Sequence, residues 1–166
     1  MLFLLFVNIR SFFLLIGIII FFIFFLDRIS KIYIINLFEN ENIVDITVSP
    51  FLSLILVWNS GIGFGLLQLD QTFAYNLITA LILIINLIII YFLFTTESTL
   101  KIFFSMILGG SFGNFYDRIN YSAVPDFIDL NYNGYHWFVF NVADIFITIG
   151  ILALILFEIF KKKNDK

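Results

Sequence analysis

Apolar residues along this chain form long, nearly uninterrupted runs instead of recurring at the spacing of an amphipathic helix or strand. Four such runs alternate with segments richer in polar residues, and each is close to the about 20 residues that a helix needs to cross a bilayer. A helix that is apolar on every side is surrounded by a large protein core or by lipid. The pattern therefore predicts an all-α integral membrane protein, with four transmembrane helices at about 12–30, 73–94, 100–118 and 140–160.

Two of the segments between the runs are long enough to hold structure of their own. The first, at about 36–71, contains IVDITVS and FLSLILVWN, rich in β-branched and aromatic residues, and then the glycine-rich NSGIGFGLL. These features favour a small β element with a glycine turn at the membrane surface. The second, at about 120–139, is expected to be an irregular loop or a short interfacial helix, because its aromatic residues suit the headgroup level. The alternative, that both segments are only connecting loops, remains open.

The composition agrees with a lipid environment: 61% of the residues are hydrophobic, 13% are charged, and the mean hydropathy is +1.06. No linker-like shift in composition and no repeat divides the chain, so residues 1–166 are interpreted as one domain. No basic stripe is present, which argues against nucleic acid as a partner. The absence of cysteine excludes thiol catalysis, cysteine-ligated metal and disulfides.

Basic residues predict how the helices are oriented. Lysines crowd the C-terminal tail at 161–166, Arg10 precedes the first run, and Lys101 lies between the second and third runs. With four spans all of these fall on one side of the membrane, which the positive-inside rule makes cytoplasmic. Both termini are therefore expected in the cytoplasm. The first run is interpreted as an uncleaved helix, because DRISK follows it where a signal peptide would have a small-residue cleavage site.

Polar residues gather at the outer end of three predicted helices. An ionisable residue inside a span costs at least about 2.5 kcal/mol on insertion scales, so each is expected to have a partner or a task. Helical spacing places the groups of each helix on one face. These groups are Asp27 with Lys31, Asn114 with Asp117 and Arg118, and Asn141 with Asp144. The inner half of each helix is almost purely apolar, so the sequence predicts one polar site toward the outer side of the membrane.

Two acids are the best candidates for catalysis. Asp144 has no base near it in the sequence, and Asp126 lies between apolar neighbours just outside the membrane. Neither position is explained by solvation or by a neighbouring ion pair. The remaining groups are interpreted as structural: the Asp27–Lys31 ion pair, the Asp117–Arg118 pair and the hydrogen-bonding side chain of Asn141.

Two motifs suggest other chemistry. GGSFG at 109–113 fits the G-x-S-x-G elbow of serine hydrolases, but that elbow needs a strand-to-helix turn, and this stretch lies inside a predicted helix. The same residues fit G-x-x-x-G, which favours close helix packing and would bring Asn114 near a neighbouring helix. A Mg²⁺ site formed by Asp126, Asp129 and Asp144 is conceivable. However, the D-G…A-R…G…D…D pattern of membrane phosphatidyltransferases and the G-x-G-D of another membrane aspartyl protease class are absent.

Taken together, the motifs resemble those of the lipoprotein signal peptidases (signal peptidase II), a family of bacterial membrane aspartyl proteases. The matching stretches follow the family's order along most of the chain. They are DRISK (27–31), NSGIGFG (59–65), GGSFGNFYDRI (109–119), VPDFID (124–129) and FNVAD (140–144). Their combination is specific, whereas any one of them alone is not. The chain departs from the family at Gly63, where alanine is usual, and at Phe138, where a proline often occurs.

The resemblance implies a role for each matching residue. Asp126 and Asp144 would form a catalytic dyad, in which two carboxylates share one proton because like charges about 3 Å apart cannot both ionise. One acid would activate a water and the other would protonate the leaving amine. The implied polar shell is Asn59, Gly61, Asn114, Arg118 and Asn141, and the implied structural support is Asp27, Lys31 and Asp117.

The resemblance also implies a substrate and a location. The substrate would be a prolipoprotein whose cysteine carries a diacylglyceryl group, and the cut would fall just before that cysteine. The partners would be such precursors and membrane lipids, with no metal or organic cofactor, and we expect a monomer. The enzyme would lie in the bacterial cytoplasmic (inner) membrane, with both termini cytoplasmic and its site near the extracytoplasmic face.

A competing hypothesis is a transporter or proton carrier that uses the same buried acids as a relay. It would favour polar groups spread across the depth of the membrane, whereas the inner halves of these helices are apolar. Cleavage of a lipidated precursor by the purified protein in the presence of EDTA would separate the peptidase from both the transporter and the metal-dependent alternative.

Overall fold

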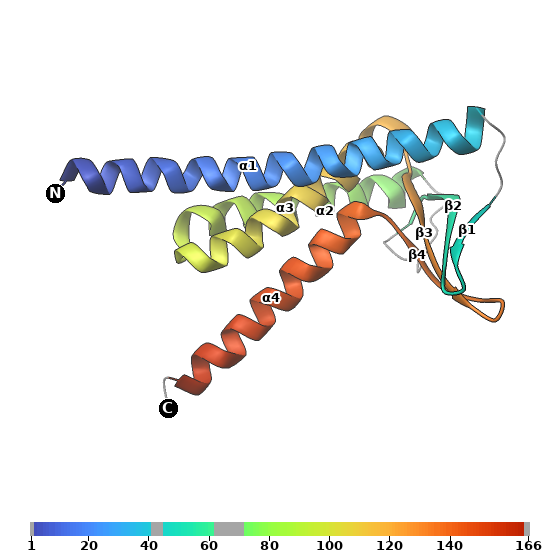
Figure 1. Cartoon of the computed structure of the whole chain (residues 1–166). Coiled ribbons are helices and arrows are strands. Elements are labelled where there is room, and N and C mark those ends of the chain that lie inside the picture. Colours follow the sequence, from blue (N-terminus) through green and yellow to red (C-terminus); the bar gives the residue numbers. More distant parts are fainter. Residues whose placement is uncertain (1, 41–44, 62–71, 165–166) are drawn as a thin grey trace.

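The computed structural model describes residues 2–40, 45–61 and 72–164. Within these residues the chain forms four α-helices and one four-stranded sheet (Figure 1). The helices are α1 (Leu2–Ile35), α2 (Thr72–Thr95), α3 (Ser98–Tyr121) and α4 (Val142–Asn164), and α1 continues into the short π-helix η1 (Asn36–Asn40). Three of the four predicted spans therefore lie within a helix, while the fourth, 140–160, starts two residues before α4 because Phe140 ends β4. Helix α1 extends well beyond its predicted bounds and is about 50 Å long at 1.5 Å per residue.

Three of the described helices are long and apolar enough to cross a membrane: Phe12–Glu39, Tyr75–Thr95 and Val142–Lys162. The protein is therefore a multi-pass membrane protein. Helix α3 has the length of a span, at 24 residues, but glycine, serine and charged residues make it less apolar than the others. The hydropathy of α1, α2 and α4 is high enough to indicate membrane spans. That α3 also crosses the membrane stays a prediction.

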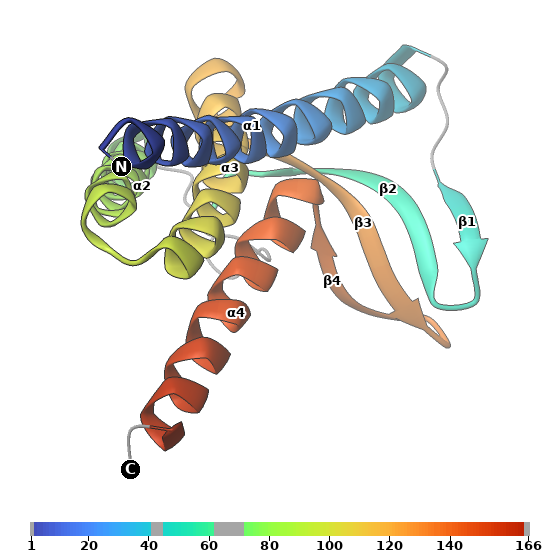
Figure 2. The same cartoon turned by 60° about the vertical axis from the view of Figure 1, so that its left-hand side comes forward.

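The sheet lies at one end of the helices, away from the start of α1 and the end of α4 (Figures 1 and 2). Its strands are β1 (Ile46–Ser49), β2 (Leu52–Asn59), β3 (Val124–Tyr132) and β4 (Tyr135–Phe140), all antiparallel and in that spatial order. The strands predicted from IVDITVS and FLSLILVWN are confirmed as β1 and β2. The predicted glycine turn falls mainly on residues 62–71, outside the described residues.

The prediction for 120–139 is wrong, because this segment forms strands β3 and β4 instead of an irregular loop or a short helix. It also makes the fold less purely α-helical than predicted. The hairpin turn consists of Asn133 and Gly134, with positive φ angles of 50° and 80°. Asn-Gly is the sequence that a tight hairpin turn favours, since both positions need left-handed backbone angles. The sequence of this segment shows no regular strand pattern, but its hydrogen bonds to β2 hold it in an extended conformation.

Glycines of helix α3 allow its neighbours to approach closely, as the G-x-x-x-G pattern predicts. A side chain at Gly109 would lie 3.0 Å from the backbone oxygen of Ile20 on α1. A side chain at Gly110 would lie 2.5 Å from the backbone oxygen of Ala143 on α4. Helix α3 is thus packed between α1 and α4, and Ser111 lies inside it rather than at a strand-to-helix turn. The serine-hydrolase interpretation therefore lacks its structural requirement.

The buried apolar core consists of residues from α1, α2 and α3, and its least exposed member is Leu108, at 2%. Away from the sheet, α2 and α3 also bury the polar residues Asn86 and Ser105. Asn86 of α2 is 1% exposed, and neither atom of its amide has a hydrogen-bond partner among the described residues. Asn86 is thus a buried polar group in α2, which is not one of the three helices whose inner halves were expected to be almost purely apolar.

Candidate active site

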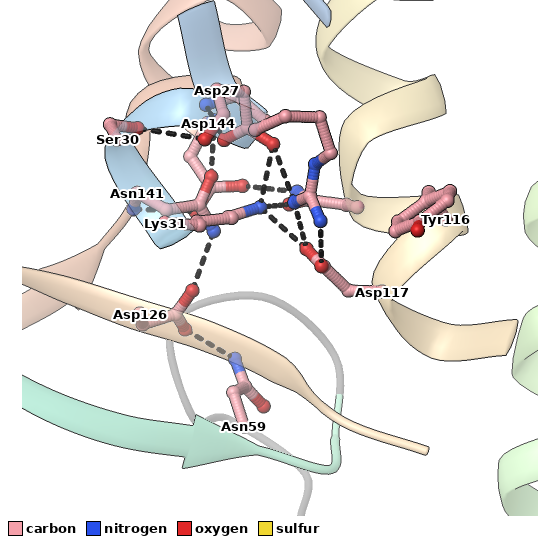
Figure 3. A network of polar contacts seen from close by, with 12 residues as sticks. Asp27, Ser30, Lys31, Asn59, Tyr116, Asp117, Asp126, Asn141 and Asp144 are labelled. Atoms are coloured by element: carbon pink, nitrogen blue, oxygen red, sulfur yellow. Dashed lines mark hydrogen bonds and ion pairs between the residues drawn. The ribbon is translucent and has the colours of Figure 1, made fainter. Parts of the chain in front are cut away.

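Polar side chains from helices and sheet converge where the helices meet the sheet (Figure 3). The structure brings together the side chains that the sequence singled out for catalysis, for the polar shell and for support. They are Asp27, Lys31, Asn59, Asn114, Asp117, Arg118, Asp126, Asn141 and Asp144. Most are buried, while Asn114 and Asp144 are half-buried. The cluster therefore depends on its own hydrogen bonds and ion pairs rather than on water.

Asp144 is fixed at the first turn of helix α4 by Asn141. The backbone N–H of Asn141 donates to Asp144 Oδ2 at 3.1 Å, and the backbone N–H of Asp144 donates to Asn141 Oδ1 at 3.1 Å. This reciprocal pair is a capping box, which satisfies two N–H groups at a helix start. The position of the Asp144 carboxylate thus follows from the way α4 begins.

Asn141 also reaches the second acid. Its side-chain amide donates to Asp126 Oδ1 at 2.6 Å, and the amide of Asn59 donates to Asp126 Oδ2 at 2.8 Å. Strand β3 carries Asp126, and β2 presents Asn59 beside it, so sheet pairing sets this geometry. One asparagine therefore contacts both acids, although 18 positions separate them in the sequence.

A cavity of about 230 Å³ lies against this pair. Its apolar lining is Ile82, Val124 and Ile147. Its polar lining is Asn59, Ser111, Asn114, Arg118, Asp126, Asn141 and Asp144. A substrate in this cavity would meet both carboxylates and an apolar wall at the same time.

The environment of Asp126 opposes its ionisation. Its pKa is raised from 3.8 to about 6, first because burial removes the carboxylate from water and second because the charge of Asp144 is close. Hydrogen bonds from Asn59 and Asn141 stabilise the carboxylate and partly offset these effects. A carboxyl group that titrates near pH 6 can hold or release a proton near neutral pH, as acid–base catalysis requires.

Behind Asp144 lies a buried group of charges. Lys31 is 2.9 Å from Asp27 and 2.7 Å from Asp117, and it donates to Asn114 Oδ1 at 2.8 Å. Asn114 in turn donates to Asp144 Oδ1 at 2.8 Å. The ion pair predicted at the end of the first helix is present, and it is connected to Asp144 through one amide.

Asp27 has a second structural task. Its Oδ1 accepts a hydrogen bond of 3.0 Å from the backbone N–H of Ala143, in the first turn of α4. Gly113 leaves the space that the Asp27 carboxylate occupies, since a side chain at that glycine would collide with it. Helix α4 is therefore joined to α1 by a hydrogen bond at its start, next to Asp144.

Arg118 connects the cavity to the chain beyond strand β2. It donates to the backbone oxygen of Gly61, whose N–H donates to Asn59 Oδ1 at 2.9 Å. The guanidinium lies 5.5 Å from the ring centre of Tyr75, and the Tyr75 hydroxyl donates to the Arg118 backbone oxygen at 3.0 Å. Gly61 thus takes part in the site through its backbone oxygen and N–H, and these contacts require no side chain.

Sequence reasoning missed two residues of this site, Tyr75 and Arg28. Tyr75 begins the apolar run of α2 and gives no local signal. Arg28 is 7% exposed and donates to both Asp27 and Asp117. Its position beside Asp27 in DRISK was a usable signal, since a second base within a predicted span needs a buried acid.

Asp129 lies apart from the other two acids of the conceivable Mg²⁺ site. It accepts from Asn131 at 2.9 Å and contacts His136 at 2.7 Å. Among the described residues, no three acidic, histidine or cysteine side chains are grouped as a metal site would need. The single histidine of the chain, His136, lies in the hairpin next to Asp129.

Comparisons with known proteins agree with the resemblance. A family model described as signal peptidase (SPase) II matches residues 19–160. The lipoprotein signal peptidase of Pelagibacter ubique (strain HTCC1062) is 53% identical over 163 residues, which cover 96% of this chain and 98% of that protein. The lipoprotein signal peptidase of Anaplasma phagocytophilum (strain HZ) is 37% identical over 140 residues, 84% of this chain and 88% of the relative.

Two solved structures share the fold. One, described as a "Bacterial membrane enzyme structure by the in meso method at 2.3 A resolution", has a TM-score of 0.74 and 28% identity, and covers 91% of each chain. A second of the same description, at 1.9 A resolution, has a TM-score of 0.67 and 31% identity over 85% of this chain and 90% of the other. Since a family model matches residues 19–160 and these relatives are 53% and 37% identical over 96% and 84% of its length, this chain belongs to the signal peptidase II family of peptidases.

Proposed function

We propose that the protein is an aspartic endopeptidase that removes signal peptides from diacylglyceryl-modified prolipoproteins. The observation that carries the proposal is the joint position of Asp126 and Asp144, which line one cavity and are both hydrogen-bonded to Asn141. The related proteins named lipoprotein signal peptidase support the substrate class. We place the cut just before the lipid-modified cysteine.

In the proposed mechanism the two acids share one proton. The ionised carboxylate takes a proton from a water in the cavity, and the protonated one donates to the carbonyl oxygen of the scissile bond and then assists departure of the amine. The raised pKa of Asp126, about 6, supports this, because it keeps the proton available near neutral pH. The pair titrates as a unit, so the roles of base and acid are assigned to the pair rather than to one member. The mechanism needs neither a metal nor an organic cofactor.

The cavity lining fits a lipid-modified peptide. Ile82 and Ile147 belong to α2 and α4, two of the three apolar helices that pack against α3. An acyl chain of the substrate can stay in hydrocarbon beside these helices while the scissile bond reaches the carboxylates. We infer that α3 is the fourth span, that both termini are cytoplasmic, and that the site opens near the extracytoplasmic face of the bacterial inner membrane. We also infer a single domain that acts as a monomer.

The test uses purified protein and a precursor carrying diacylglyceryl-cysteine. Asp126→Asn and Asp144→Asn are each expected to abolish cleavage while the protein still unfolds cooperatively in detergent. Asp129→Asn is the matched control, because Asp129 is a buried acid on the same strand as Asp126, but its carboxylate interacts with Asn131 and His136 in the hairpin instead of lining the cavity. It is expected to retain cleavage. Full activity of either dyad variant would refute the proposed dyad.

EDTA and an unlipidated precursor complete the test. Cleavage is expected to persist in EDTA, since the proposed chemistry uses only the two carboxylates and water. The unlipidated precursor is expected to be cleaved poorly, because it cannot place an acyl chain beside α2 and α4. Loss of cleavage in EDTA, restored by a divalent cation, would replace the proposed mechanism with a metal-dependent one.

A further inference from the structure

Arg28 belongs to a group of buried charges that the proposed chemistry does not use directly. We call this group the buried quartet: Asp27, Arg28, Lys31 and Asp117. Their exposed fractions are 0%, 7%, 0% and 0%. Two acids and two bases make the quartet electrically neutral. Removing one member leaves an uncompensated charge where little water can screen it.

The guanidinium of Arg28 makes a bidentate contact with the carboxylate of Asp117. Its Nη1 donates to Asp117 Oδ1, and its Nη2 donates to Asp117 Oδ2 at 2.7 Å and to Asp27 Oδ2 at 2.9 Å. Tyr116 covers the guanidinium, with 4.9 Å between its carbon and the ring centre. Such a two-point contact fixes the orientation of the carboxylate, which a lysine at the same place could not do.

Lys31 uses all three of its N–H groups. They face Asp27 Oδ2 at 2.9 Å, Asp117 Oδ2 at 2.7 Å and Asn114 Oδ1 at 2.8 Å. Because the Asn114 oxygen accepts from Lys31, the other end of this amide must be the N–H₂ group, which donates to Asp144 at 2.8 Å. Lys31 thereby determines which end of the amide Asp144 receives.

From these contacts we propose that Arg28 is a positioning residue for the catalytic pair. Lys31 lies between Asp27 and Asp117, and its single positive charge cannot balance both. Arg28 supplies the second positive charge, so that Lys31 can hold Asn114 against Asp144 without leaving a carboxylate of the quartet uncompensated. Arg28 also keeps the quartet neutral, so that Asp126 and Asp144 do not lie beside a group with a net negative charge. The proposal rests on the proposed function, because it concerns the same two acids.

The charges around the pair define what a change at Arg28 should do. They are Asp27, Arg28 and Lys31 from α1, Asp117 and Arg118 from α3, Asp144 from α4 and Asp126 from β3. Loss of the positive charge of Arg28 makes the surroundings of Asp126 and Asp144 more negative. The fully protonated pair then loses its first proton less readily, which disfavours the singly ionised form that the mechanism needs. The acidic limb of the pH–activity profile should therefore move to higher pH.

The experiment compares pH profiles for cleavage of the lipid-modified precursor. Arg28→Met is expected to lower kcat by roughly tenfold or more and to move the midpoint of the acidic limb upward by roughly 0.5 to 1 pH unit. Asp117→Asn leaves the quartet with a net positive charge and should move the midpoint downward. In the double variant Arg28→Met/Asp117→Asn, the remaining Asp27 and Lys31 balance, and the midpoint should return to its wild-type position.

Two controls isolate the effect. Lys162→Met removes a positive charge from an exposed position near the C-terminal end of α4 and should leave the profile unchanged. Asp126→Asn, measured in parallel, tests the proposed function itself. If the wild type cleaves the precursor and this variant does not, the proposed function is supported independently of the result for Arg28→Met. A wild-type midpoint in Arg28→Met, or no return in the double variant, overturns the role of Arg28. If Arg28→Met does not fold, Asp117→Asn is compared with the double variant. The proposal then requires that the acidic midpoint, lowered in Asp117→Asn, returns to its wild-type position in the double variant.

Discussion

Asn141 and Asp144 exchange two hydrogen bonds of 3.1 Å at the first turn of helix α4. The exchange has the form of a capping box, so the same contacts that start the helix also hold one of the proposed catalytic acids. The remaining donor of Asn141 reaches the other acid, Asp126, at 2.6 Å. Helix initiation and the geometry of the proposed site therefore depend on one asparagine.

Substitution of Asn141 should separate these two roles. Asn141→Ala removes both the cap and the hydrogen bond to Asp126, and is expected to lower stability by about 1 kcal/mol and kcat/KM by roughly 10- to 100-fold. Asn141→Ser keeps an oxygen that can cap the helix but lacks the amide that reaches Asp126, so it should lose activity with little loss of stability. Thermal unfolding in detergent and precursor cleavage measure the two effects. Wild-type cleavage by Asn141→Ser would contradict the bridging role.

The raised pKa of Asp126 predicts a pH-dependent stability. A carboxyl group whose pKa rises from 3.8 to about 6 on folding binds its proton more tightly in the native state. It therefore stabilises the fold below about pH 4 relative to high pH, and this contribution is lost as the pH rises through about 6, by about 3 kcal/mol in all. Asp126→Asn cannot ionise, so its stability relative to wild type should increase between pH 4 and pH 8. A difference that stays constant over this range would contradict the prediction.

Gly113 should not tolerate even one methyl group. A side chain there collides with the carboxylate of Asp27, which cannot move freely because it is held by Lys31 and by the N–H of Ala143. Gly113→Ala is expected to destabilise the protein by about 1–3 kcal/mol and to abolish most cleavage. Gly17→Ala is the matched control, since nothing lies within 4 Å of its added methyl group. It should be neutral or slightly stabilising, because alanine is the better helix former.

Asn86 should be replaceable with a gain in stability. Both atoms of its buried amide lack a hydrogen-bond partner among the described residues, and an unsatisfied polar group inside an apolar bundle is unfavourable. Asn86→Leu is expected to stabilise the protein by about 1 kcal/mol and to leave precursor cleavage intact. Thermal unfolding in detergent measures the change. A loss of stability would show instead that the amide is hydrogen-bonded in the bilayer.

Much of the fold could be predicted from the sequence, because local patterns decide it. Uninterrupted apolar runs predict helices, and each predicted span overlaps an observed helix almost completely, the fourth starting two residues before α4. Helical spacing places Asp27 with Lys31 on one face, and the structure contains that ion pair. The small residues at 109–113 predict close helix packing, which the glycine contacts confirm.

The remainder depends on contacts between distant segments. Strands β3 and β4 form because β2 offers a pairing edge, and nothing near residue 126 in the sequence reveals that edge. Arg28 belongs to the site because Asp117, 89 residues away, faces it. Asn86 could be seen in the sequence, but its lack of a partner follows only from packing. The capping box at Asn141 was accessible to sequence reasoning, as an N-x-x-D stretch before an apolar run, and was overlooked.

The two acids are carried by different kinds of structure, Asp126 by a strand and Asp144 by a helix. Their meeting therefore requires both the pairing of β3 with β2 and the packing of α4 against α3. In the proposed peptidase, a change that disrupts either of these contacts separates the two acids and removes cleavage, even where the other contact stays intact.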